Sequence, residues 1–153
     1  MPAMTIDGAC FCGHLTFEAE IDPEAVLVCH CTDCQTLGGA AFRVVAPAIA
    51  GSFRLLSGQP TIYVKVADSG NRRRQAFCPT CGTAIYSAPA DGAAGHLGLR
   101  AATLRQYRDL VPHNQYWCRS ALPWLDQLDD IPRHDTSRGP SATDDPRRER
   151  GSA

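Results

Sequence analysis

The stretch from Cys29 to Cys34 reads Cys-His-Cys-Thr-Asp-Cys and places three thiols within six residues. This arrangement is too tight for disulfides between these thiols, and its spacing is typical of metal ligands. Zinc binds thiolates at about 2.3 Å in a tetrahedron, so three sulfurs from one short turn can cap one face of the ion. The stretch therefore predicts a zinc site whose fourth corner is filled from elsewhere.

Two further cysteine pairs occur in the chain, Cys-Phe-Cys at residues 10–12 and Cys-Pro-Thr-Cys at residues 78–81. Each pair is followed directly by glycine, Gly13 and Gly82, whereas Cys34 is followed by Gln35. Glycine allows a tight turn, with φ above zero if needed, so that backbone amides can point at bound sulfurs. We therefore predict two zinc ions per chain, one in a closed structural site and one in an open site. The closed site comprises Cys10, Cys12, Cys78 and Cys81, and the open site comprises Cys29, Cys31 and Cys34.

The cysteines also allow two other assignments. In one, Cys31 and Cys34 join the 78–81 pair as a two-knuckle zinc ribbon, and Cys29 completes an open site with the 10–12 pair. In the other, the 29–34 cluster is a second structural site with a fourth ligand such as Cys118 or a histidine. Cys118 is the remaining eighth thiol, and a lone cysteine is most often a small buried hydrophobic residue.

Five segments, taken in order, resemble the glutathione-dependent formaldehyde-activating (GFA) family, whose domain is shared with centromere protein V. They are Gly8–Phe17, Cys29–Cys34, Phe77–Thr83, Ser120–Trp124 and Ile131–Arg133. The resemblance covers about residues 7–134 and places seven cysteines in register. It implies an all-β, tent-like zinc fold in which the 10–12 and 78–81 pairs hold a structural zinc. It further implies that the 29–34 cluster holds a catalytic zinc.

The length and composition of the chain fit one folded domain and a tail. A chain of 153 residues with 44% hydrophobic content forms a small core, and metal sites would add stability. Residues 5–134 are predicted to form the zinc domain. Residues 135–153 contain no large apolar side chain, so burial cannot offset the entropy of ordering them, and we predict a disordered tail.

The cysteines and charges restrict the location and partners of the protein. The N-terminal residues 1–7 show neither a basic region nor an apolar run typical of a signal peptide, so we expect a reducing cytoplasm and metal-bound thiolates. No apolar run approaches the roughly 18 residues that span a bilayer, which predicts no membrane association. The net charge is −1, with Lys65 the one lysine among 15 basic residues, and gives no broad attraction toward nucleic acid.

The apolar pattern predicts an all-β fold of short antiparallel strands. Residues 15–22 alternate between apolar and polar side chains, as a half-buried strand does. Further strands are expected at 42–46, 53–56, 61–66, 72–77, 83–87 and 96–101, with 61–66 and 72–77 forming a hairpin. Residues 36–41 read as a glycine loop, and residues 104–110 as the only helix-like segment.

Several polar residues are candidates for substrate contacts. Arg72, Arg73 and Arg74 could clamp a carboxylate, although alternation along a strand lets only part of this run face one pocket. The alternative candidates are Arg43, Arg100 and Arg119. His30 and Asp33 lie within the ligand turn, where we expect them to face solvent rather than to act as hydrogen-bond partners or proton shuttles.

The chemistry of an open three-thiolate zinc site favours another thiol as its ligand. Three thiolates give the Zn²⁺ complex a net charge of −1, which weakens Lewis acidity, whereas zinc readily ionises a bound thiol. A thiolate beside a small aldehyde would add to it and give a hemithioacetal, and the reverse reaction cleaves a carbon–sulfur bond. The resemblance implies glutathione as the thiol and formaldehyde as the aldehyde. We therefore predict a zinc-dependent carbon–sulfur lyase, and the alternative is a non-catalytic, zinc-stabilised binding module.

Overall fold

The computed structural model describes residues 2–92 and 96–137, and these residues form mostly β-structure. The all-β prediction is therefore confirmed. Within the described residues the strands are β1 Met4–Ala9, β2 Thr16–Ile21, β3 Leu27–Cys29, β4 Arg43–Pro47, β5 Arg54–Ser57, β6 Thr61–Val66, β7 Arg72–Phe77, β8 Ala84–Pro89, β9 Gly98–Arg100 and β10 Asn114–Tyr116. The helix α1 spans Thr32–Gly38, and 3₁₀ turns cover Pro23–Ala25, Ala101–Thr103, Tyr107–Asp109, Cys118–Ser120 and Leu125–Asp130.

A three-stranded antiparallel sheet has the order β1-β2-β5. Its central strand follows the predicted alternation, because Phe17, Ala19 and Ile21 are buried while the residues between them are at least partly exposed. The period of two along a strand directs these apolar side chains to one face. That face forms one half of the core.

A seven-stranded sheet has the order β10-β3-β4-β9-β8-β7-β6. Its neighbours are antiparallel except β10 and β3, which are parallel and depart from the expected antiparallel pattern. Cross-strand partners lie on the same face of a sheet, so the register decides which side chains meet. Following the pairs from β3 to β7, one face carries Cys29, Arg43, Arg100, Ser87, Gln75 and Arg73.

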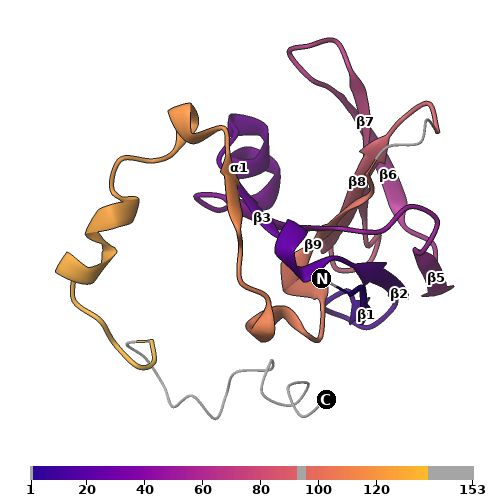
Figure 1. Ribbon diagram of the computed structural model, residues 1–153, viewed down its shortest axis with the longest axis horizontal. Coiled ribbons are helices and arrows are strands. Elements are labelled where there is room, and N and C mark those ends of the chain that lie inside the picture. Colours follow the sequence, from indigo (N-terminus) through magenta and orange to yellow (C-terminus); the bar gives the residue numbers. More distant parts are fainter. Residues whose placement is uncertain (1, 93–95, 138–153) are drawn as a thin grey trace. The chain divides into compact units, whose positions relative to one another are not determined.

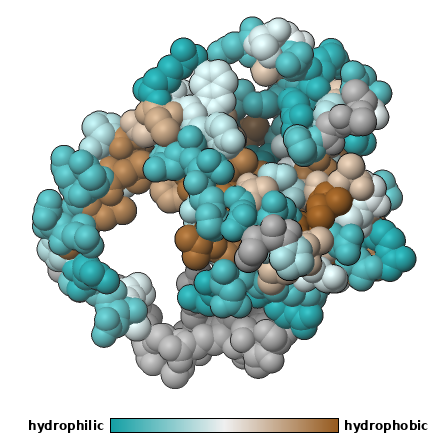
Figure 2. Space-filling view, viewed as in Figure 1, coloured by the Kyte–Doolittle hydropathy of each residue, from teal (hydrophilic) through white to brown (hydrophobic). Residues whose placement is uncertain are grey.

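The opposite face of this sheet packs against the three-stranded sheet. Ala46 and Leu99, which are paired between β4 and β9, belong to the same buried cluster as Phe17. The Phe53 ring lies between the sheets, with its centroid 5.6 Å from that of Phe17 and 5.2 Å from that of Tyr86. The face of the molecule seen in Figure 2 is mostly hydrophilic, with apolar residues in separate patches, as expected when the two sheets share their apolar faces.

Two secondary-structure predictions were wrong. The helix-like segment 104–110 contains only a 3₁₀ turn, Tyr107–Asp109, because Leu104 is held in a β-bridge to Gly8. The first half of the predicted glycine loop, residues 36–38, belongs instead to α1, which is capped at Gly39 with a φ of 62°. Tertiary contacts override local propensity in segments this short.

The described residues fall into two units, 2–121 and 122–137. The first unit contains both sheets and α1, and Figure 1 shows α1 next to the end of β3. The second contains the Leu125–Asp130 turn and an exposed ion pair between Arg133 and Asp129. Residues 138–153 of the predicted tail lie outside the described residues. No helix in the described part of the chain has the length and apolar content needed to cross a membrane.

Candidate functional site

Four cysteine thiols from two distant parts of the chain lie together. The sulfurs of Cys10, Cys12, Cys78 and Cys81 all lie within 4.8 Å of one another. The Sγ atoms of Cys10 and Cys12 are 3.6 Å apart, and those of Cys12 and Cys78 are 3.8 Å apart. A tetrahedral zinc site with metal–sulfur bonds of about 2.3 Å requires sulfurs roughly 3.8 Å apart. The four thiols therefore fit such an ion in both donor type and spacing.

The turns that hold these four thiols depend on glycine. Gly13 and Gly82, which follow the two pairs, have φ angles of 82° and 78°. These values lie in the left-handed region that glycine adopts without a steric cost. The backbone N–H of Gly13 donates to the carbonyl of Cys10 and that of Gly82 to the carbonyl of Cys78, so each pair sits in a closed turn. The predicted use of positive φ at these glycines is confirmed.

Hydrogen bonds from the chain stabilise sulfurs of this four-thiol cluster. The N–H of Leu15 donates to Cys10 Sγ at 3.2 Å. Thr83 Oγ1 accepts from the N–H of Phe11 at 3.0 Å and lies 3.1 Å from Cys81 Sγ, so its own proton is free to point at that sulfur. Burial raises the pKa of Cys81, but hydrogen bonds from the Thr83 side chain and backbone outweigh it and lower the value to about 5. Cys81 is thereby prepared to act as a thiolate ligand.

The other three predicted thiols form a second cluster. The sulfurs of Cys29, Cys31 and Cys34 lie within 4.8 Å of one another. Cys29 ends β3, and Cys31 is the N-cap of α1, where its Sγ accepts from the N–H of Cys34 at 3.2 Å. This bond takes the place of the usual oxygen cap at a helix start. The sequence signal for this cap is hidden, because cysteine is not a common capping residue.

The pKa values of Cys29 and Cys34 are shifted in opposite directions. A hydrogen bond from Cys34, together with contacts to Cys31, lowers the pKa of Cys29 to about 5 despite burial. The same hydrogen bond and burial raise the pKa of Cys34. Without metal, these interactions favour the thiolate form of Cys29 and the thiol form of Cys34, so metal binding must displace the Cys34 proton.

The grouping differs from both alternative assignments. Cys31 and Cys34 lie with Cys29 and not with the 78–81 pair, as a two-knuckle ribbon would require. Cys118 is outside both groups and is exposed, so the expectation of a buried small residue at that position was wrong. No histidine of the described residues belongs to either group.

His30 is buried, which contradicts the expectation that it faces solvent. Only 3% of its surface is exposed, and its Nε2 lies 2.8 Å from Gln115 Oε1 on β10. Its backbone N–H donates to the carbonyl of Tyr116, which is paired with Cys29. His30 therefore fastens the parallel strand β10 beside the three-thiol cluster. Asp33 is exposed as expected, and its Oδ2 forms an ion pair with Lys65 Nζ at 2.7 Å.

A pocket of about 270 Å³ lies between α1 and the sheet. Leu37 of α1, Arg43 of β4, Tyr63 of β6 and Gln75 of β7 contribute to its lining. Leu37 follows Cys34 by three residues, so the two side chains share a face of the helix. Gly82 of the four-thiol turn also lines it. The pocket therefore reaches from the helix that carries the three-thiol cluster to the turn of the other cluster.

Arg43 lies on the side of this pocket next to the three thiols. It is paired with Cys29 across β3 and β4, and its Nε lies 3.0 Å from where a Cβ on Gly38 would be. Burial lowers the pKa of Arg43, and attraction to Cys34, Cys31 and Cys29 opposes that shift. Sequence reasoning placed Arg43 second to the 72–74 run, because the pairing that brings it to Cys29 is not visible locally.

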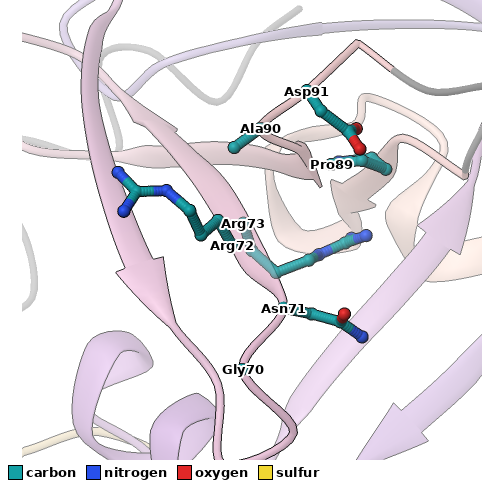
Figure 3. A pocket seen from close by; sticks show the side chains of 7 residues that line it. All are labelled: Gly70, Asn71, Arg72, Arg73, Pro89, Ala90 and Asp91. Carbon is teal, nitrogen blue, oxygen red and sulfur yellow. The ribbon is translucent and has the colours of Figure 1, made fainter.

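The 72–74 run does not form one clamp. A second pocket, of about 560 Å³, is lined by residues 70–73 and 89–91 and by no cysteine. Figure 3 shows that the Arg72 and Arg73 side chains extend to opposite sides of β7. Arg73 donates to Ser87 Oγ at 3.3 Å, and Arg74 donates to the Pro89 carbonyl at 3.2 Å. The expected alternation along this strand is confirmed, and the three guanidinium groups have separate partners or directions.

Comparisons with known proteins agree with this architecture. A crystal structure of a Rhodobacter sphaeroides protein is 22% identical and superposes with a TM-score of 0.55, covering 71% of this chain and 98% of that protein. At this identity the likeness shows the fold alone. A search of curated proteins gives no match. The family model described as glutathione-dependent formaldehyde-activating enzyme matches residues 5–120, which include both thiol clusters. This chain therefore belongs to the glutathione-dependent formaldehyde-activating (GFA) family.

Proposed function

We propose that this protein is a zinc-dependent carbon–sulfur lyase that joins a small thiol to a small aldehyde, or separates them. Its structural zinc is assigned to the four-thiol cluster and its catalytic zinc to the three-thiol cluster. The observation that carries the proposal is the number of ligands. Three thiols converge at the second cluster, and no further cysteine, histidine or carboxylate of the described residues joins them. A closed structural site uses four ligands, whereas a catalytic site keeps one position for substrate.

The sulfur donors fit zinc and favour a sulfur substrate. A zinc ion held by the three-thiol cluster would supply one open, soft coordination position that ionises a thiol near neutral pH. Arg43 lies beside these sulfurs and offsets negative charge that accumulates there. The adjoining pocket gives room for part of a substrate next to the cluster, and Leu37 and Tyr63 are among its lining residues.

The proposed reaction balances without an oxidant or reductant. The thiol sulfur attacks the carbonyl carbon, a carbon–sulfur bond forms, and the carbonyl oxygen takes up the proton that the thiol lost. The product is a hemithioacetal, and the lyase direction reverses each step. Membership of the family supports glutathione and formaldehyde as the first pair to test. Eight free cysteines fit a reducing compartment, so we also propose a cytoplasmic location.

Cobalt substitution tests the proposal directly. Adding glutathione to the cobalt-loaded protein should change the thiolate-to-metal charge-transfer and ligand-field bands, because a fourth sulfur enters the open site. The response should grow with pH as the free thiol, with a pKa near 8.5, ionises. Cys34→Ser should abolish it and retain the spectrum of the four-thiol site. Unchanged spectra with millimolar glutathione and other small thiols would instead favour a zinc-stabilised binding module without chemistry.

A further inference from the structure

Two arginines are buried without an acidic partner. Arg43 and Arg100 are each only 8% exposed. The ion pairs in the described residues join Arg54 to Glu18, Lys65 to Asp33, Arg105 to Asp7 and Arg133 to Asp129, and none involves these two arginines or Arg73. Burying a guanidinium without a counterion costs several kcal/mol by an order-of-magnitude estimate, so such groups usually serve a negatively charged ligand or site.

The three guanidinium groups belong to one face of the seven-stranded sheet. Arg43, Arg100 and Arg73 share that face through the strand register. Burial lowers the pKa of Arg100 to about 10, with Arg43 also lowering it and the thiols of Cys34 and Cys29 opposing the shift. The guanidinium groups are thus close enough to repel one another, and all remain protonated at neutral pH.

The three-thiol cluster alone does not balance this charge. Three thiolates on Zn²⁺ would carry a net charge of −1, whereas the buried Arg43 and Arg100 carry +2, which leaves +1 beside this cluster. A negative charge placed beside Arg43 would offset this local excess. A substrate that brings its own anionic group would supply that charge each time it binds.

The hydrogen bonds indicate where that group binds. Arg100 donates from one Nη to Gln75 Oε1 at 2.9 Å, which fixes the Gln75 amide. Gln75 lines the 270 Å³ pocket together with Arg43, and within the described residues neither the Gln75 amide nitrogen nor the Arg43 guanidinium donates a hydrogen bond. The Arg100 Nε is also buried without a partner. The Gln75 amide and the Arg43 guanidinium thus belong to the lining of one small pocket, and a carboxylate can accept from such a pair of donors with both oxygens.

We propose that this pocket binds a carboxylate of the thiol substrate, so that the protein prefers anionic thiols. Arg43 and the Gln75 amide contact the carboxylate, and Arg100 is a positioning residue that orients Gln75 and adds positive charge. This inference rests on the proposed thiol chemistry, but the pocket makes its own prediction about charge. The small volume suits one carboxylate arm rather than a whole peptide.

Calorimetric titration of the zinc-loaded protein with matched ligands tests the inference. The probes are 3-mercaptopropionate, its neutral isostere 3-mercaptopropionamide, propionate and inorganic phosphate. We expect the carboxylate thiol to bind at least tenfold more tightly than the amide. In Arg43→Gln this preference should fall below threefold while amide binding is retained, and Arg43→Lys should recover part of it. The matched control Arg54→Gln, which alters an exposed arginine paired with Glu18, should keep the full preference.

A second variant protects the test against misfolding. Gln75→Glu keeps an acceptor for Arg100 and places a negative charge in the pocket, so it should weaken the carboxylate thiol and spare the amide. Equal loss of both thiols in Arg43→Gln would overturn the inference, because the arginine would then only balance the thiolates. Tighter binding of phosphate than of propionate would also overturn it. Arg43-dependent binding of propionate without binding of either thiol would support the anion site and contradict the proposed thiol chemistry.

Discussion

Replacing Thr83 by valine should weaken zinc binding at the four-thiol cluster. The substitution keeps the side-chain shape but removes the hydroxyl that lies 3.1 Å from Cys81 Sγ. Loss of a hydrogen bond to a metal ligand typically reduces metal affinity 10- to 100-fold, which is about 1.4–2.7 kcal/mol. A hydrogen bond to a charged group contributes about 1.5–3 kcal/mol, so two independent estimates agree.

The pH dependence of this loss has a defined sign. Although burial raises it, the Thr83 hydrogen bonds bring the pKa of Cys81 to about 5, below its ordinary value of 9.0. Without the hydroxyl the pKa of Cys81 rises, so zinc must displace a proton that the wild-type protein has already lost at neutral pH. The difference in affinity should therefore be greatest near pH 6–7 and should shrink as the pH rises toward 9.

Competition with a chromophoric chelator measures the affinity of each zinc ion. Thr83→Ser retains the hydroxyl and should bind zinc like the wild type. Thr16→Val removes a hydroxyl whose partner is Ser57 rather than a sulfur, and it should leave zinc affinity unchanged. If Thr83→Val binds both zinc ions within threefold of the wild type at pH 6.5, the hydroxyl does not stabilise the thiolate and the reasoning fails.

Three further predictions concern folding and metal content. Cys81→Ser should unfold or aggregate the protein, because structural zinc contributes on the order of 10 kcal/mol to folding. Cys34→Ser should instead stay folded and bind one zinc ion rather than two. Circular dichroism checks the folding of each variant, and metal analysis checks its zinc content. Gly58→Ala should lower the free energy of unfolding in urea by more than 2 kcal/mol, because it adds a Cβ 2.6 Å from a backbone oxygen at a φ of 78°. The control Gly70→Ala has a φ of 86° but open space around it, so it should cost only the roughly 1–2 kcal/mol of left-handed strain. Equal losses in the two variants would show that the close contact at Gly58 is unimportant. Asp7→Asn should lower the free energy of unfolding by less than about 1 kcal/mol at pH 7, because the ion pair between Asp7 and Arg105 is largely exposed. Hydrogen bonds from Gln106 and Arg105 lower the pKa of Asp7 below 3.8, so this stabilisation is present above pH 4 and should disappear as the pH falls below that value. A stability difference between wild type and variant that persists at pH 2 would contradict this linkage.

The sequence by itself determined the chemistry that the chain carries. The spacing of the cysteines and the glycines after two of the pairs indicated a four-thiol and a three-thiol group, and the sulfur atoms lie in those groups. Alternation along residues 15–22 indicated a half-buried strand, and the structure has β2 there. These features are local, because ligand spacing, glycine φ and a period of two act within a few residues.

Only the tertiary structure decided which side chains surround the three-thiol cluster. The burial of His30 depends on Gln115 and on the parallel pairing of β10 with β3, 85 residues apart in sequence. The row from Arg43 to Arg100 and Gln75 depends on a strand order, β4-β9-β8-β7, that does not follow the chain. A single sequence contains no local signal for such pairing, since shifting the register by one residue would turn every one of these side chains to the other face.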